Sequence, residues 1–402
     1  MIKNNFPIDT VRKDTPACQH KIHLNNAGAS LQPLAVLNTM RAYFELEAMT
    51  GGYETAVLKA DEIAAFYELL AQLLRTQKHN IAFATNATSA YAKALSSIPF
   101  QKGDVILTTD DDYVSNQIAF LYLVKQLGVK LIRAHKQQNG GVDVNAIEDL
   151  IQKHRPKLVA VTHVPTNSGL VQDVNAIGQI CEAAGVWYLV DACQSAGQLD
   201  VNVNHIKCDF LSATFRKFLR GPRGTGFLYV SDKALQGGLT PIFPDLHGAK
   251  WTTPNTYVLN QTAKRFEYWE RNYSNLLGAK AAVAYALDIG MPAIEQRVKS
   301  LSDYARTKLA ALTDFQILDQ GNALCGIIGL HSPKYDWQAL KAKLIAHHFN
   351  VSVAVKSSAW IDFEEKGVEW ALRISPHYYN TEQEIDTLFD FLQSLPLCGS
   401  SH

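Results

Sequence analysis

The sequence predicts an α/β protein with a mainly parallel seven-stranded sheet covered by helices, followed by a smaller C-terminal α+β domain. Seven short apolar runs recur between about residues 80 and 230. Helical stretches lie between several of these runs, among them QIAFLYLVKQLG (117–128) and VNAIGQICEAAG (174–185). Alternation of strands and helices at this spacing is typical of a parallel sheet with helices on both faces. From about residue 265 the pattern changes to long helical stretches with a few short strands.

The seven runs are expected to be buried strands. In chain order they are IAFAT, DVILTTD, VKLIRAH, LVAVTHV, WYLVDAC, FLSAT and GFLYV. Most are nearly continuous apolar stretches without strict alternation, as expected of strands covered on both faces. Ligands of such sheets bind at the carboxyl ends of the strands. The polar residues that close each run are therefore the candidates for function.

Length and composition favour one soluble chain with a large core. We expect a large α/β domain over residues 21–264 and a small α+β domain built from residues 1–20 and 265–402. The 38 basic and 38 acidic residues cancel, which argues against a nucleic-acid or membrane partner. No run approaches the roughly 18 apolar residues of a spanning helix, and the opening MIKNNFPIDT lacks a signal peptide's apolar core. The six cysteines form no CxxC pair, so we expect no metal site, no disulfide framework and a cytoplasmic location.

Asp191 and Lys217 are the first candidate pair. Asp191 follows an apolar strand and is expected to be poorly solvated, although a helix N-cap or turn aspartate is the ordinary alternative. Lys217 follows the next strand, where a lysine is commonly a solvated loop residue. Here Arg216, Arg220 and Arg223 lie close in the sequence with no acid among them. Like charge and partial burial both lower a lysine pKa and favour the free amine.

A free lysine amine paired with a buried carboxylate suits pyridoxal 5'-phosphate (PLP). The amine would hold the aldehyde as a Schiff base, and the carboxylate would hold the ring nitrogen in its protonated form. The phosphate would lie where Ala87, Thr88 and Ser89 begin a helix, because free N–H groups and the helix dipole attract anions. Asn86 as an ordinary N-cap is the alternative interpretation. Thr214 and Arg216 would reach the same phosphate.

Further strand ends supply groups that could contact the ring. Tyr113, in DDDYVSNQ, could stack on the cofactor, although such a tyrosine is more often a packing residue. Thr166 and Asn167, in THVPTNSG, are candidate hydrogen-bond donors to the ring hydroxyl, as is Gln194. His163 is given no role, since it could be a core histidine.

These motifs resemble the class V aminotransferases of fold type I, which are PLP-dependent enzymes. The resemblance covers nearly the whole chain and is carried by LNNAGASLQP, GGYE, NATSA, DDDYVSN, THVPTNSG, DACQSAGQ, RKFLRGPRGTGFLYV, RFEYWE and ALRISPHYYNTEQEID. The family includes cysteine desulfurases, selenocysteine lyases and isopenicillin N epimerase-like proteins. The resemblance implies a fold type I PLP-dependent transferase-like fold, with the cofactor in the large domain.

The resemblance implies a role for each residue of the proposed cofactor site. Lys217 matches the lysine that forms the Schiff base, and Asp191 matches the partner of the pyridine nitrogen. Thr88 matches a phosphate ligand. Thr214 and Arg216 match the serine and histidine of a Ser-Gly-His-Lys phosphate cup, so that arginine replaces histidine as the cation.

Other matches concern the ring, the substrate and a second subunit. Tyr113 matches the ring that stacks on the cofactor, commonly histidine in the desulfurases, and Gln194 matches the ligand of the ring oxygen. Arg373 matches the arginine that binds the substrate carboxylate, a task that suits its planar fork of donors. The family is dimeric with shared active sites, which implies a homodimer in which Thr252 or Thr253 reaches the partner's phosphate.

One departure from the family separates this chain from the desulfurases. Cysteine desulfurases carry a catalytic cysteine on a loop shortly before the carboxylate-binding arginine. The corresponding stretch VSVAVKSSAWIDFEEKG has Ser357 and Ser358 but no cysteine, and the nearest preceding cysteine is Cys325. Sulfur transfer through an enzyme persulfide needs a thiolate. We therefore predict an enzyme that acts without one.

The shared chemistry leaves the reaction open. We expect an amino-acid substrate, α-proton abstraction by Lys217, and a C–S or C–Se lyase such as a selenocysteine lyase or a cysteine lyase-like enzyme. An aminotransferase or an epimerase is the alternative, and epimerisation requires a second acid that we cannot identify. Tyr53, His377 and Tyr378 are candidate substrate-pocket residues, with ordinary packing as the other interpretation.

Two other classes of protein fit less well. A dinucleotide-binding dehydrogenase is disfavoured because GPRGTG is not GxGxxG and precedes a strand instead of following one. A non-catalytic binding protein on a PLP scaffold is disfavoured because both Lys217 and Arg373 are present.

Overall fold

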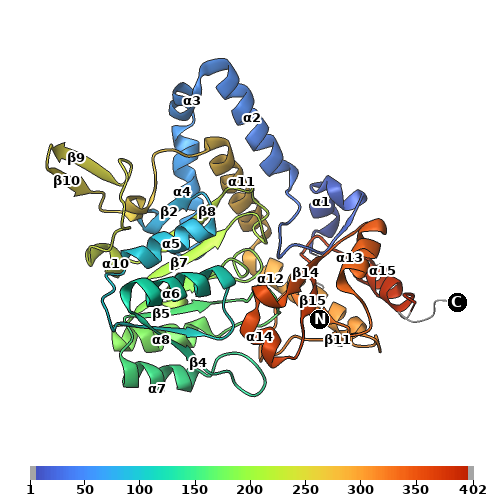
Figure 1. Ribbon diagram of the computed structural model, residues 1–402. Coiled ribbons are helices and arrows are strands. Elements are labelled where there is room, and N and C mark those ends of the chain that lie inside the picture. The colour runs from blue at the N-terminus through green and yellow to red at the C-terminus, as the bar shows by residue number, and fades with distance from the viewer. Residues whose placement is uncertain (1–5, 397–402) are drawn as a thin grey trace.

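A seven-stranded sheet forms the centre of the larger part of the computed structural model, which describes residues 6–396 (Figure 1). Its strands are β2 (Ile81–Ala84), β3 (Val105–Thr109), β4 (Lys130–Ala134), β5 (Leu158–Thr162), β6 (Trp187–Asp191), β7 (Phe210–Thr214) and β8 (Gly226–Val230). Their spatial order is β2-β8-β7-β6-β5-β3-β4. β8 runs antiparallel to β2 and β7, whereas the pairs between β7 and β4 are parallel. The mainly parallel sheet predicted from the seven apolar runs is confirmed.

Helices cover both faces of this sheet. One face packs against α4 (Ala60–Leu74), α7 (Val144–His154), α8 (Val174–Ala184), α9 (Val203–Ile206) and α11 (Tyr273–Ile289). The other face packs against α5 (Ala87–Ser97), α6 (Val114–Leu127) and α10 (Asp232–Gln236). Successive side chains of a strand point to opposite faces, so Leu189 and Val190 belong to different cores. Burial on both faces explains why the predicted runs are almost continuously apolar.

A smaller antiparallel sheet lies beside the first (Figure 1). Its strands, in spatial order, are β11 (Gln316–Ile317), β12 (Ile328–His331), β15 (Trp370–Ile374) and β14 (Ser352–Val355). The helices packed on it are α12 (Met291–Leu309), α13 (Trp337–Ala346) and α15 (Glu382–Gln393). Within residues 6–396, no single helix is long and apolar enough to cross a membrane. The pair α11 and α12 meets that length and composition only as two segments bent by 80°.

Segments near the N-terminus attach to both parts. α1 (Ile8–Lys13) precedes β1 (Ile22–His23), which pairs in parallel with β13 (Phe349–Asn350) beside the smaller sheet. Two features project from the body: the arm of α2 (Leu34–Thr50) and α3 (Gly52–Leu58), and the hairpin of β9 (Ala249–Thr253) and β10 (Thr256–Leu259) (Figure 1). The short 3-10 helices are η1 (Pro16–Gln19), η2 (Lys78–Asn80), η3 (Ala263–Phe266) and η4 (Lys356–Ser358).

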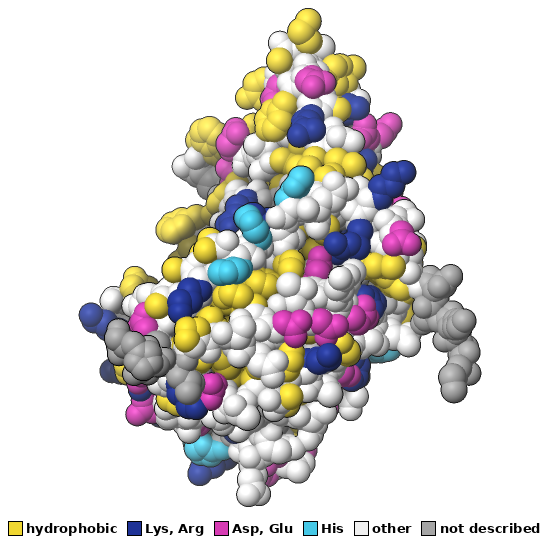
Figure 2. Space-filling model, turned by 90° about the vertical axis from the view of Figure 1, so that its right-hand side faces the viewer, with side chains coloured by type: hydrophobic (Ala, Val, Ile, Leu, Met, Phe, Trp, Pro, Cys, Tyr) yellow, Lys and Arg dark blue, Asp and Glu magenta, His cyan; other side chains and the backbone are white. Residues whose placement is uncertain are grey.

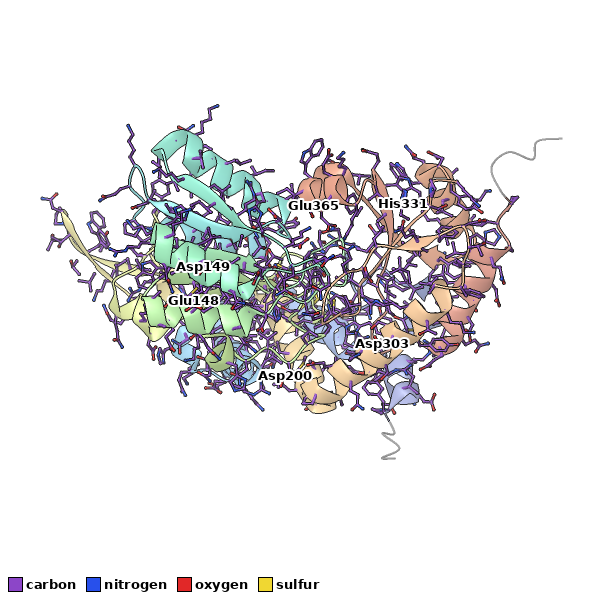
Figure 3. All side chains as sticks on the ribbon, turned by 90° about the horizontal axis from the view of Figure 1, so that it is seen from below. Glu148, Asp149, Asp200, Asp303, His331 and Glu365 are labelled. Carbon is purple, nitrogen blue, oxygen red and sulfur yellow. The ribbon has the colours of Figure 1, made fainter. Side chains whose placement is uncertain are left out.

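A cluster of charges joins the two sheets. Lys136 follows β4. Its Nζ lies 3.2 Å from Asp111 Oδ1, 3.3 Å from Asp362 Oδ1 and 2.7 Å from Glu365 Oε2. Asp362 and Glu365 belong to α14 (Trp360–Glu365), and Glu365 is labelled in Figure 3.

The predicted boundary between the two domains is a separate matter. Although α11 follows residue 264, it packs on the larger sheet. The division at residues 20 and 264 therefore stays a prediction.

The strand register brings four strand ends to one level of the larger sheet. Asp191 of β6 pairs with Thr162 of β5 and with Ser212 of β7. Ala84 of β2 and Thr214 of β7 both pair with Gly226 of β8. A Cβ at position 226 would lie only 2.7–2.8 Å from backbone atoms at the start of α5. Glycine therefore allows β8 to lie directly against that helix, where the strand ends meet.

Candidate functional site

A cavity opens where these strand ends meet the starts of α5 and α6. Nine of the residues predicted to bind a cofactor line it, namely Ala87, Thr88, Tyr113, Thr166, Asp191, Gln194, Thr214, Arg216 and Lys217. The cavity is also lined by four residues that carried no such prediction, namely Asn86, Thr162, Val164 and Cys193. The fold therefore brings together in one place groups that are up to 131 residues apart in the chain (Asn86 to Lys217).

Lys217 is a buried amine in this cavity. It follows β7 directly, and its Nζ lies 6.0 Å from the centroid of the Tyr113 ring. Burial lowers the pKa of Lys217, and the charges of Arg216 and Arg373 lower it further, while Cys193 and Asp191 act in the opposite direction. At a given pH, a larger fraction of Lys217 is therefore present as the free amine than of a solvated lysine.

Arg220 does not contribute to this effect as the sequence suggested. Its guanidinium is fully buried elsewhere: Nε donates to the Leu31 carbonyl at 2.8 Å and NH1 donates to the Tyr378 hydroxyl at 2.9 Å. The guanidinium carbon also lies 4.6 Å from the centroid of the Tyr379 ring. Arg220 therefore ties the N-terminal segment to the core, and Arg373, distant in sequence, is the second cation near Lys217.

Asp191 is held by two neutral donors at the end of β6. Its Oδ1 accepts a hydrogen bond from the Cys193 amide at 2.9 Å, and its Oδ2 accepts one from Asn116 Nδ2 at 3.1 Å. The first bond is the turn contact that the ordinary interpretation predicted, yet the carboxylate also lines the cavity. The contact of Asn116 was missed in the sequence, although Asn116 stands in the motif DDDYVSN. Burial and the nearby Asp191 raise the pKa of the Cys193 thiol well above its ordinary value.

The start of α5 and Arg216 bring positive charge to the lining of the cavity. Asn86 caps the helix by accepting the Ser89 amide at 2.8 Å, as the ordinary interpretation predicted. Ala87 and Thr88 line the cavity and are the first two residues of α5, whose amides have no acceptor within the helix. Arg216 also lines the cavity and donates to the Gly28 carbonyl. Free amides, a helix dipole and a guanidinium together suit a phosphate.

Arg373, on β15 of the smaller sheet, does not line the cavity but bonds to Thr166, which does. Its NH1 donates to the Thr166 hydroxyl at 3.0 Å and its NH2 donates to Asn25 Oδ1 at 3.2 Å. Gln194 Nε2 also donates to the Thr166 hydroxyl, at 2.9 Å. Gln194 Oε1 and Arg373 Nε are buried and have no hydrogen-bond partner within residues 6–396. Burial and the charge of Arg216 lower the pKa of Arg373 to about 10, so an anion beside it would be stabilised.

Three predicted residues point away from the cavity because each has a partner elsewhere. Asn167 donates to Asp362 Oδ2 at 2.6 Å, which holds it against α14 rather than near a cofactor ring. His377 is buried, with its Nε2 bonded to the Phe218 carbonyl at 2.8 Å. Tyr378 accepts the bond from Arg220 described above. His377 and Tyr378 therefore follow the packing interpretation, and neither lines the cavity.

Three other predicted residues lie on the projecting features. Tyr53 begins α3 and its side chain is 74% exposed. Thr252 and Thr253 lie on the exposed hairpin, where their hydroxyls bond to Thr256. None of the three contacts the cavity of its own chain, so any role of theirs in a site requires a second copy.

The cysteines of the described region offer no thiolate to this site. The segment that precedes β15 contains η4 with Ser357 and Ser358, and no cysteine. Cys193 lines the cavity but has the raised pKa noted above. Cys325 is buried and does not line it, and burial raises the pKa of its thiol to about 12. The last cysteine, Cys398, lies outside the described residues.

Comparisons with known proteins agree with this arrangement. A sequence model of the family described as aminotransferase class-V matches residues 22–388. A Methanothermobacter thermautotrophicus protein named "Probable cysteine desulfurase" is 29% identical over 97% of this chain and 98% of its own length. A Pyrococcus abyssi protein of the same name is 26% identical over 96% of this chain and 97% of its own length.

Solved structures share the fold. The apo structure of a cysteine desulfurase from Thermococcus onnurineus NA1 matches with a TM-score of 0.89 and 26% identity, over 98% of both chains. The cystine C–S lyase C-DES, in complex with its reaction product cysteine persulfide, matches with a TM-score of 0.85 and 20% identity. That match covers 95% of this chain and 99% of the other.

Proposed function

The chain belongs to the aminotransferase class-V family, and on this premise we propose that it is a C–S or C–Se lyase that acts without an enzyme-bound persulfide. It is a PLP-dependent enzyme, as that family membership indicates. The relatives named as cysteine desulfurases support a cysteine-like substrate. The single observation that carries the proposal is a buried lysine and a carboxylate in one cavity that contains no low-pKa thiol.

The residues of the cavity fit PLP. The unpaired amides of Ala87 and Thr88, with Arg216, suit the phosphate, and Asp191 suits the ring nitrogen. Gln194 Nε2 already donates to Ala27 and Thr166, whereas its Oε1 is buried without a partner in the described part of the chain, so a ring substituent that donates a hydrogen bond would satisfy it. We infer that these residues, with Tyr113, Thr166, Thr214 and Lys217, hold the cofactor.

The chain's own residues would divide the chemical tasks among them. Bound PLP supplies an electron sink for the negative charge that develops on the substrate's α-carbon. Lys217, with its lowered pKa, is the group placed to take the α-proton. Arg373 is the candidate for the substrate carboxylate, because its guanidinium is buried beside the cavity residue Thr166 and its Nε has no partner within residues 6–396.

The missing loop cysteine determines where sulfur goes. Transfer to the enzyme needs a thiolate, and the cavity offers only the Cys193 thiol, whose pKa is raised. Sulfur would therefore leave with the electron pair of the broken Cβ–S bond and take up a proton. With cysteine and water as reactants, the balanced products are pyruvate, ammonia and hydrogen sulfide.

An assay of products tests this proposal. The PLP-loaded enzyme is given cysteine, cystine, selenocysteine or alanine, and pyruvate is measured with and without an added 2-keto acid. We expect pyruvate from one of the sulfur or selenium substrates without a keto acid, and none from alanine. Cys325→Ser should retain activity within about threefold, because Cys325 lies outside the cavity, whereas Lys217→Ala should lose it.

Other outcomes would identify the alternatives. Pyruvate or alanine formation that requires a keto acid would show an aminotransferase, and exchange of the α-proton with loss of optical rotation would show an epimerase. If Cys325→Ser abolished sulfur release, an enzyme persulfide would be required and the proposal would be wrong. The homodimer, the cytoplasmic location and the selenocysteine substrate stay predictions.

A further inference from the structure

Asn116 lies between two carboxylates beside the cavity. It stands in the first turn of α6 and is buried. Its Nδ2 lies 3.1 Å from Asp112 Oδ1 and 3.1 Å from Asp191 Oδ2. A primary amide carries two N–H groups on this nitrogen, so each carboxylate can accept one of them. Asp191 lines the cavity, but neither Asp112 nor Asn116 does.

Asp112 is a fixed anchor for this amide. Its Oδ1 also accepts the Tyr113 amide at 2.7 Å and the Thr162 hydroxyl. Its Oδ2 accepts Gln117 Nε2 at 2.9 Å and the Thr108 hydroxyl at 3.2 Å. Donors from β3, β5 and α6 thus hold one carboxylate in place.

The two carboxylates together fix the orientation of the Asn116 amide. Rotating the amide by half a turn would place its oxygen against two carboxylate oxygens and leave both without the donor. That arrangement is disfavoured by repulsion and by lost hydrogen bonds. Asn116 therefore presents an N–H to Asp191 in a single orientation.

We propose that Asn116 is a positioning residue that fixes the rotation of the Asp191 carboxylate, and that Asp112 in turn fixes Asn116. This inference rests on the proposed function, in which Asp191 faces the ring nitrogen of PLP. The Cys193 amide holds one oxygen of Asp191 and Asn116 holds the other, so the plane of the carboxylate is set before the cofactor enters. Because asparagine is neutral, it holds Asp191 without cancelling the negative charge that the ring nitrogen requires.

Asn116→Leu tests the inference, since leucine has a similar volume and no donor. Partners that orient metal-ligating side chains typically change affinity or activity about 10- to 100-fold when removed, and we expect an effect of that order for a partner that orients Asp191. We expect the PLP dissociation constant to rise about tenfold, and kcat to fall about tenfold or more with KM changed less than about threefold. The pH midpoint of the bound cofactor's visible absorption should rise by about half a unit, because a less firmly protonated ring withdraws fewer electrons.

Gln117→Leu is the matched control. Gln117 is the next residue of α6 and also donates to Asp112, but it has no contact with Asp191. The PLP dissociation constant and kcat of Gln117→Leu should stay within about twofold of the wild-type values, and the midpoint of its absorption titration should match that of the wild type. If Asn116 had only a structural role, Asn116→Leu and Gln117→Leu would both change the stability of the protein, and the midpoint of the absorption titration would not move. That result would overturn the inference.

Asp112→Asn provides a second test if Asn116→Leu does not fold. It keeps the shape of the anchor but removes its charge, so Asn116 is held less firmly. The titration midpoint should move in the same direction by a smaller amount, and an unchanged midpoint would contradict the proposal. Failure of the proposed function is distinguishable, because it would appear in the products formed by the wild type, whereas the absorption titration depends only on bound PLP.

Discussion

His163 is a buried imidazole whose effect on stability depends on pH. It follows β5, and its Nδ1 has no hydrogen-bond partner in the part of the chain that the structure describes. Burial lowers its pKa to about 4, and Asp173 opposes this only in part. In the unfolded chain the same group binds a proton near pH 6.5. Its contribution to stability is therefore complete above about pH 6.5 and is lost as the pH falls towards 4.

His163→Leu should reduce the sensitivity of the protein to acid. Between pH 7 and pH 4.5 the wild type should lose about 2 kcal/mol more of its unfolding free energy than the variant, since unfolding of the wild type takes up one more proton than unfolding of the variant. Urea unfolding at several pH values measures this difference. His205→Gln, at an exposed site, is the control and should follow the wild type. Parallel curves for the wild type and His163→Leu would contradict the assignment.

The sequence predicts single residues well where a motif and a strand end coincide. Lys217, Asp191 and Thr88 were predicted for this reason, and they line one cavity. The role of Asn116 depends on how α6 turns its first residues towards β6, which no local pattern reveals. Asn167 was misplaced because its partner, Asp362, belongs to a helix almost 200 residues later.

At the level of elements, Glu267 ties an edge strand to the segment after η3. It is almost fully buried, and its Oε1 accepts the Phe83 amide of β2 at 2.8 Å. Its Oε2 accepts the Tyr67 hydroxyl of α4 at 3.0 Å and pairs with Arg271 at 2.5 Å. One carboxylate thus joins β2, α4 and the start of α11.

Glu267→Gln should destabilise the fold strongly. Removing the charge leaves the buried Arg271 without its ion-pair partner, and breaking a buried pair in this way costs about 3–5 kcal/mol. Urea unfolding of the purified protein gives the value. Glu68→Gln is the control, because its ion pair with Lys78 is exposed and should contribute less than about 1 kcal/mol. Similar losses for both variants would show that Glu267 is not the tie described here.

Elements that are buried on both faces are the ones that the sequence specifies most clearly. All seven apolar runs became strands of the larger sheet, because a strand covered on both faces has few polar positions. The hairpin β9–β10 has no comparable apolar run in the sequence. Most of its side chains are exposed, so neither of its faces packs against a core. Arg220 was misjudged for a related reason: the aromatic residues that enclose it come from segments far along the chain.

On the scale of the whole molecule, the projecting features carry apolar side chains on their surface. Trp251 and Val258 of the hairpin are 77% and 56% exposed, and Met49 and Val57 of the arm are 85% and 75% exposed. Figure 2 shows apolar side chains gathered at the top of the molecule, where Figure 1 places α2 and α3. Large apolar side chains exposed together on projecting features are typical of a subunit interface. We propose that a second copy of the chain covers it.

A double variant of the hairpin tests the dimer. Trp251→Asp with Val258→Asp should convert a dimer into a monomer in sedimentation experiments, because two charges would be buried in an apolar interface. It should also weaken PLP binding if Thr252 or Thr253 reaches the partner's phosphate. Ile345→Asp, on the exposed side of α13, is the control and should stay dimeric. A monomeric wild type, or a dimeric double variant, would contradict the proposal.

The central claim is that the amine of Lys217 holds the cofactor. Borohydride reduction of the PLP-loaded protein, followed by peptide mass spectrometry, locates the attachment directly. The account predicts a phosphopyridoxyl group on the peptide that contains Lys217, absent in Lys217→Ala and retained in Lys93→Ala. Lys93 is a fair control because burial lowers its pKa too, to about 8, although it bonds to the Phe266 carbonyl at 2.7 Å. Attachment at another lysine, or no attachment to the wild type, would contradict the account.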